Sequence, residues 1–167
     1  MRRIRFSRTQ WARAVLAMTV LATVAPVSAF GQIESRIGTW ELDLAKSTFS
    51  PGPAPRRQTL TYQAAGKQWT ALVQGIDASG RPINPDVDNL LIRFDGRDHP
   101  TANADYETTT WQRLDPSKYL VIRKKAGKVV LTSANVLSPD GKTMTITTTG
   151  KNASGQPVNN VRVYVKK

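Results

Sequence analysis

The sequence predicts an all-β domain, an antiparallel up-and-down meander of nine to ten strands closed into a barrel. Apolar and polar residues alternate with a period of two in segments such as 40–44 and 68–73, which is typical of half-buried strands. Threonine is concentrated at 108–110 and 143–149, where a β-branched, half-polar side chain suits a sheet face in contact with water. No segment after Ile33 shows a convincing helical spacing of apolar residues.

Short turn sequences define the individual strands. Residue pairs and quartets rich in Gly, Pro, Asp and Asn supply positive φ angles and side-chain turns at seven places. These are 65–66, 77–80, 95–96, 115–117, 126–127, 138–141 and 152–155. The segments between them predict strands at 37–45, 58–64, 67–76, 86–94, 105–114, 118–125, 128–137, 142–151 and 157–166, with a further short one near 98–101. An open sheet of so many strands would leave two unprotected edges, so a barrel is favoured over a sandwich or an open blade.

Two connections invite a functional interpretation. Residues 70–84 and 145–159 match at seven of fifteen positions, which fits either two equivalent binding loops or two places that need the same tight turn. The segment 47–55 holds three prolines and one glycine, which favour an extended strap across one end of the barrel. Such a strap could serve as a lid or only as a connection.

The first 29 residues have the composition of a signal peptide. Five arginines precede an uncharged stretch that runs from Ala14 to Val27. The small residues Val27 and Ala29 fit a signal-peptidase site. We expect cleavage after Ala29, with Gly31 as the alternative, and a mature domain spanning 30–167. The protein is then exported, periplasmic or secreted, and only its signal peptide contacts a membrane. An uncleaved anchor is the alternative, and Arg2-Arg3 also allows a twin-arginine route.

Composition excludes most catalytic chemistry. The 167 residues contain no Cys and one His, so thiol nucleophiles, iron–sulfur clusters, thiolate zinc sites and multi-histidine metal centres are ruled out. No Ser lies in a G-x-S-x-G motif, and Asp98 cannot readily orient the neighbouring His99, because adjacent residues of an extended segment point to opposite faces. We expect no catalytic residues, no metal site and no cofactor, and therefore no enzyme.

Positive charge also raises the question of nucleic acid. Cleavage removes five arginines and no acid, which lowers the formal charge from +12 to +7. The basic run 123–125, with Lys128 across a turn, has only Trp111 and Tyr119 as nearby aromatics for base stacking. Lysines at such a turn also protect sheet edges from aggregation. With an exported chain, we expect no nucleic-acid partner.

Two short motifs resemble those of the calycins, the superfamily of lipocalins and fatty-acid-binding proteins. Gly38-Thr39-Trp40 resembles the G-x-W opening, and Arg162-Val163-Tyr164 followed by a charge resembles the end of the last strand in the fatty-acid-binding branch. The sequence of residues 38–55 also resembles that of a set of small exported bacterial proteins described only as lipocalin-like. The proline-rich strap departs from the helical pair of the fatty-acid-binding branch, and the lipocalin T-D-Y turn has only Asp105-Tyr106 as a partial echo.

The resemblance implies a ligand-binding function through Arg162, Tyr164 and Trp40. Trp40 can close one barrel end while its N–H finds a carbonyl. If Arg162 and Tyr164 look inward, as in the fatty-acid-binding branch, a guanidinium and a phenol could hold a carboxylate; if the alternating valines look inward, both are surface residues.

The leading hypothesis is therefore an exported, non-enzymatic, lipocalin-like protein that binds a small hydrophobic or amphipathic ligand with a lipophilic or carboxylate character. The alternative is a solid barrel that acts as a structural or protein-interaction module of the cell envelope. Inward-facing residues decide between them. A solid interior would be packed by the apolar residues Trp40, Leu42, Val73, Leu90, Ile92, Leu120, Ile122, Met144 and Ile146.

Overall fold

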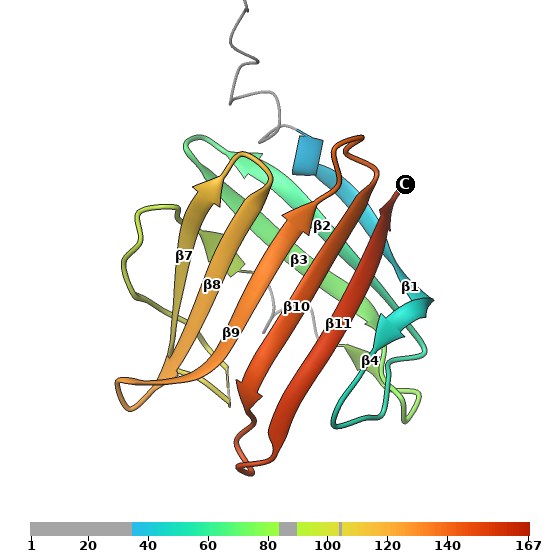
Figure 1. Cartoon of the computed structure of the whole chain (residues 1–167), viewed down its shortest axis with the longest axis vertical. Coiled ribbons are helices and arrows are strands. Elements are labelled where there is room, and N and C mark those ends of the chain that lie inside the picture. The colour runs from blue at the N-terminus through green and yellow to red at the C-terminus, as the bar shows by residue number, and fades with distance from the viewer. Residues whose placement is uncertain (1–34, 84–89, 104) are drawn as a thin grey trace, which may run out of the picture.

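A computed structural model describes residues 35–83, 90–103 and 105–167, and they form one antiparallel sheet (Figure 1). Its strands are β1 (Gly38–Thr48), β2 (Arg57–Ala65), β3 (Gln68–Ile76), β4 (Pro82–Ile83), β5 (Leu90–Ile92), β6 (His99–Pro100), β7 (Thr108–Asp115), β8 (Lys118–Lys125), β9 (Lys128–Leu137), β10 (Thr143–Lys151) and β11 (Pro157–Lys166). The predicted signal peptide and its cleavage sites lie outside these residues. Within the described ranges, no helix is long and apolar enough to cross a membrane.

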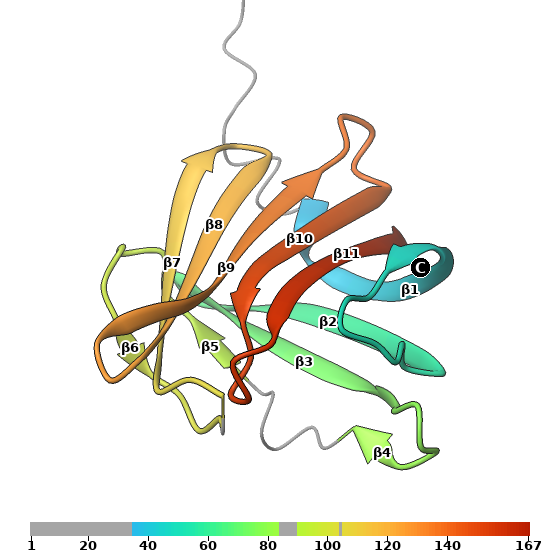
Figure 2. The same cartoon turned by 60° about the horizontal axis from the view of Figure 1, so that its bottom comes forward.

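The sheet is an up-and-down meander that returns on itself. Neighbouring strands follow the order β4-β3-β2-β1-β11-β10-β9-β8-β7-β6, and β5 pairs with β3. The first strand therefore lies beside the last, with Leu42 opposite Tyr164. In the described part of the chain, no ladder joins β5 to β6. Figures 1 and 2 show the strands curving around a common interior, as predicted.

Strand positions agree closely with those predicted from turn chemistry. β8 and β9 coincide with the predicted segments, and the short strand near 98–101 is β6. The two-residue β4 was not predicted, since it is too short to show a pattern. Of the predicted strand at 86–94, residues 90–92 form β5, residues 93–94 are not in a strand, and residues 86–89 lie outside the described ranges.

The duplicated turns at 77–80 and 152–155 have the same geometry. In each, the backbone N–H of the fourth residue, Gly80 or Gly155, donates to the carbonyl oxygen of the first, Asp77 or Asn152. The first side chain then accepts a backbone N–H from four residues on. Both glycines have positive φ, 93° and 77°. The shared sequence therefore has a sufficient explanation in one shared turn.

One end of the interior is closed around Trp40, which is fully buried. Its Nε1 donates to the Arg36 carbonyl oxygen at 2.8 Å, the kind of bond that the sequence predicted. The Arg36 guanidinium lies over the Tyr119 ring, 4.6 Å from the centroid, and donates to the Ser117 carbonyl oxygen. Burial lowers the pKa of Arg36. Large side chains fill this end of the barrel, and some of their polar groups are hydrogen-bonded there.

The face of β8 that points into the barrel differs from the one expected for a solid core. On β8, Tyr119 and Val121 are buried, whereas Leu120 and Ile122, expected inside a solid core, are half-buried on the opposite face. Both faces of β8 carry apolar residues, so alternation alone could not assign them.

On β11, the polar face with Arg162 and Tyr164 looks inward, which resolves the two alternatives left by the sequence. The proline-rich strap is tied to the same strand. The Ser50 N–H donates to Asn160 Oδ1 at 2.8 Å, and the Asn159 N–H donates to the Ser50 carbonyl oxygen at 2.6 Å.

Candidate functional site: a cavity inside the barrel

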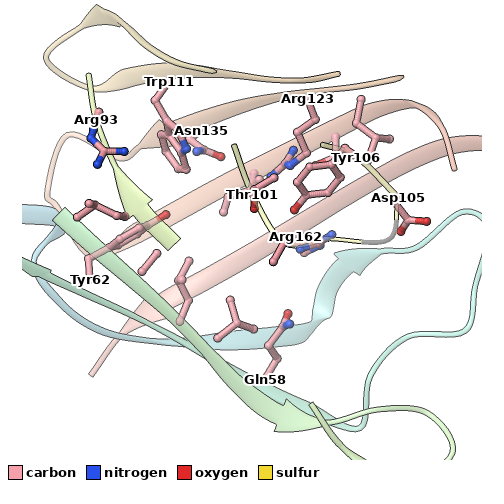
Figure 3. Close-up of a pocket in the computed structure, with 18 of the residues that line it drawn as sticks. Gln58, Tyr62, Arg93, Thr101, Asp105, Tyr106, Trp111, Arg123, Asn135 and Arg162 are labelled. Atoms are coloured by element: carbon pink, nitrogen blue, oxygen red, sulfur yellow. The ribbon is translucent and has the colours of Figure 1, made fainter. Parts of the chain in front are cut away.

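The interior holds a cavity of about 640 Å³ (Figure 3). Residues of β2, β3 and β5 to β11 line it, together with residues of the segments between β5 and β6 and between β6 and β7. Its apolar wall includes Leu60, Ala71, Val73 and Ile146. The volume falls in the range of small-molecule sites, which is about 300–1,000 Å³. The barrel is thus not packed solid.

Tyr164, beside Arg162 on the inward face of β11, forms a hydrogen bond to Gln58 across the interior. The Tyr164 hydroxyl donates to Gln58 Oε1 at 2.9 Å, which links β11 to β2. Burial raises the pKa of Tyr164, and the charge of Arg162 and a hydrogen bond from it oppose that rise. Arg162 lies two residues before Tyr164 on the same face of β11, and both side chains line the cavity.

Two further arginines line the same cavity. Arg123 on β8 donates to Ser133 Oγ at 2.7 Å and lies over the Tyr106 ring, 5.3 Å from the centroid. Arg93 follows β5. The described lining residues thus carry three arginines, Arg93, Arg123 and Arg162, and one carboxylate, Asp105. The formal charge of the cavity wall is therefore +2. A low-dielectric wall strengthens the attraction of such a site for an anion.

Trp40, the third predicted ligand-binding residue, is not among the lining residues of the cavity. It closes the filled end of the barrel instead. Direct contact between Trp40 and a ligand stays a prediction, whereas its role at the barrel end is visible in its burial and its hydrogen bond.

The single histidine is fully engaged within its own loop. His99 Nε2 lies 2.9 Å from the Asp95 carboxylate, and Arg93 Nη1 lies 3.4 Å from His99 Nδ1. Asp98, as predicted, does not orient His99; it accepts from Thr110 and from Lys124. Both ring nitrogens thus have partners. Within 35–83, 90–103 and 105–167, no cluster of three or more His, Cys, Asp or Glu could hold a metal ion.

A meander that curves around an apolar, partly cationic interior defines a small barrel-like fold of the calycin type. Two solved structures share the fold at 15% sequence identity. One is a Schistosoma mansoni fatty acid binding protein in complex with arachidonic acid, with a TM-score of 0.52 over 82% of this chain and 99% of that one. The other is a zebrafish ileal bile acid-binding protein complexed with cholic acid, with a TM-score of 0.50 over 84% and 100%.

These likenesses confirm the predicted calycin fold. No protein-family model and no curated protein sequence matches the chain.

Sequence reasoning missed most of the cavity wall. Arg123 was grouped with Lys124 and Lys125 as part of a basic surface, yet the alternation of β8 brings it to the inner face beside Val121. Arg93 and Tyr106 fall within the predicted strands 86–94 and 105–114, but the structure places them outside β5 and β7, so strand alternation does not assign their faces. The available signal for Arg123 was its spacing of two from Val121, which becomes informative only once the buried face of β8 is known.

Proposed function

We propose that this protein is an exported, non-enzymatic carrier that binds one small amphipathic molecule with an apolar body and a carboxylate head. The observation that carries the proposal is the cavity of about 640 Å³ with Arg162 on its wall. The two structural neighbours were solved with arachidonic acid and with cholic acid, which are both carboxylic acids with large apolar parts.

The chemistry of the wall fits such a ligand. The guanidinium of Arg162 has donors in a fixed fork that matches a carboxylate, and the phenol of Tyr164, whose pKa is raised by burial, is a donor at neutral pH. A charge-assisted hydrogen bond contributes about 1.5–3 kcal/mol. The apolar body would lie against Leu60, Val73 and Ile146.

The alternative, a structural module with a solid barrel, requires a filled interior, and the cavity argues against it. The engaged ring nitrogens of His99 and the single carboxylate among the described lining residues support binding without catalysis. Export is supported by the composition of residues 1–29.

The test is native mass spectrometry of the protein purified from its own compartment, paired with displacement of a fluorescent fatty acid. We expect a co-purifying adduct of a few hundred daltons, saturable probe binding, and a protein mass that corresponds to a chain starting at Phe30 or Gln32. Absence of both adduct and probe binding would refute the carrier. A chain that still contained residues 1–29 would refute signal-peptide cleavage.

The role of Arg162 is tested by Arg162→Ala, with Arg97→Ala as the matched control, since Arg97 is exposed and does not line the cavity. We expect Arg162→Ala to weaken a fatty acid about 10- to 100-fold and to change the affinity for the corresponding fatty alcohol far less. Arg97→Ala should change neither. An equal loss for acid and alcohol would show that Arg162 is not the carboxylate anchor.

A further inference from the structure

Two buried polar atoms in the cavity wall have no hydrogen-bond partner in the part of the chain that the structure describes. They are Trp111 Nε1, a donor, and Asn135 Oδ1, an acceptor. Asn135 is 3% exposed and Trp111 is 8% exposed, and both line the cavity (Figure 3). A buried polar atom without a partner costs about 1–3 kcal/mol, so such atoms are few in folded proteins and their presence needs an explanation.

The strand register places the two residues on the same wall. Trp111 pairs with Val121, and Val121 pairs with Ser133, two residues before Asn135 on β9. Two strand spacings and one two-residue step separate their Cα atoms by about 12 Å. Both residues line the cavity, so one ligand can lie against both.

The same register relates this pair to Arg162. Asn135 pairs with Ile146, and Ile146 pairs with Arg162, so the three lie in one row across β9, β10 and β11. All three line the cavity. The Cα atoms of Asn135 and Arg162 are about 10 Å apart across the apolar Ile146. A ligand anchored at Arg162 would therefore bring its body, not its head, to Asn135 and Trp111.

A donor and an acceptor together match a group that both accepts and donates. A carboxylate or a ketone could accept from Trp111 but has no proton for Asn135, and an ammonium could donate to Asn135 but has nothing for Trp111. A hydroxyl does both. We propose that Trp111 and Asn135 form a hydroxyl-binding subsite, so that the preferred ligands are hydroxylated carboxylic acids. This inference rests on the proposed function, because it needs an anionic head at Arg162.

The test compares octadecanoic acid with a series of its monohydroxylated forms, the hydroxyl being moved along the chain. Affinities are measured by displacement of a fluorescent fatty acid from the mature protein. We expect one position, or two adjacent ones, to bind about tenfold tighter than the parent acid, since two hydrogen bonds are gained in a dry site. In a wall without polar partners, a hydroxyl at any position would weaken binding.

Variants assign the preference to the two side chains. Trp111→Phe and Asn135→Leu should each abolish the preference for the hydroxylated acid over the parent acid, and far-ultraviolet circular dichroism of each variant reports whether the barrel is intact. Gln112→Leu is the matched control, because Gln112 is the exposed neighbour of Trp111 on the outer face of β7. It should leave the preference unchanged.

The outcomes separate this inference from the proposed function. If no hydroxylated acid binds tighter than the parent while Arg162→Ala still weakens the parent, the carrier stands and the subsite is refuted, its polar atoms holding water only. If the preference persists in Asn135→Leu and Trp111→Phe, the subsite is also refuted. If no acid displaces the probe, the carrier and the subsite both fall.

Discussion

Trp40→Phe should destabilise the fold more than the same substitution at Trp111. Both tryptophans are buried, at 0% and 8% exposure, and both variants remove the same atoms. Only Trp40 Nε1 has a partner, the Arg36 carbonyl oxygen at 2.8 Å, whereas Trp111 Nε1 has none among the described residues. The pair of variants therefore isolates one buried hydrogen bond at the closed end of the barrel.

The expected magnitudes follow from this difference. Shrinking a buried indole to a phenyl ring costs about 1–2 kcal/mol from lost packing. Trp40→Phe in addition leaves the Arg36 carbonyl without its donor, which adds about 1–3 kcal/mol. Trp111→Phe removes a donor that had no partner, so it carries no such penalty. We expect losses of about 3 kcal/mol for Trp40→Phe and about 1 kcal/mol for Trp111→Phe.

The assay is urea denaturation of the mature protein followed by far-ultraviolet circular dichroism, because both variants alter the fluorescence. The midpoint should fall further in Trp40→Phe, with an unchanged slope against urea concentration. Equal midpoints for the two variants would refute the reasoning, as would a Trp40→Phe loss below about 0.5 kcal/mol, since the closing bond would then contribute nothing.

Two further predictions concern turns and strand approach. Gly150 has φ of 140°, and an added Cβ would lie 2.0 Å from the Val130 carbonyl oxygen, whereas Gly127, with φ of 71°, has open space around it. Gly150→Ala should therefore lower the free energy of unfolding by at least about 2 kcal/mol more than Gly127→Ala in the same urea assay, and equal losses would contradict the close approach.

The Ser79 hydroxyl and the Arg81 backbone N–H hold the pKa of Asp77 down at about 2. Because an unfolded Asp titrates near about 3.9, this stabilisation is present above about pH 4 and is lost as the pH falls toward 2. Asp77→Asn should flatten the fall of Tm between pH 5 and 2, and an unchanged acid slope would refute the assignment.

Strand positions could be predicted because turns leave strong local signals. Pairs such as Ala126-Gly127 require positive φ, which both residues adopt at 48° and 71°, and they bound β8 and β9 at the predicted residues. The return of the chain to β1 follows from edge protection, a general property of sheets.

The inward face could not be predicted where both faces are equally apolar or where the cavity itself is polar. On β11, the valines suggest burial, yet Arg162 and Tyr164 look inward because they line a cavity rather than a solid core. In a hollow barrel, polar residues can therefore face inward and apolar residues outward at the positions that line the cavity. No sequence pattern predicts that Trp111 Nε1 and Asn135 Oδ1 are buried without a hydrogen-bond partner among the described residues, because this depends on the packing of the folded chain.

The pairing of β1 with β11 has a consequence for how the molecule forms. The register pairs Trp40 with Lys166, residues more than a hundred positions apart. The β1–β11 pairing can therefore form only after β11 is present. Contacts of such long sequence separation slow folding, because a large loop of chain must be ordered before they form. A polypeptide emerging from a ribosome would therefore expose the apolar residues of its interior to solvent and chaperones until β11 has been synthesised.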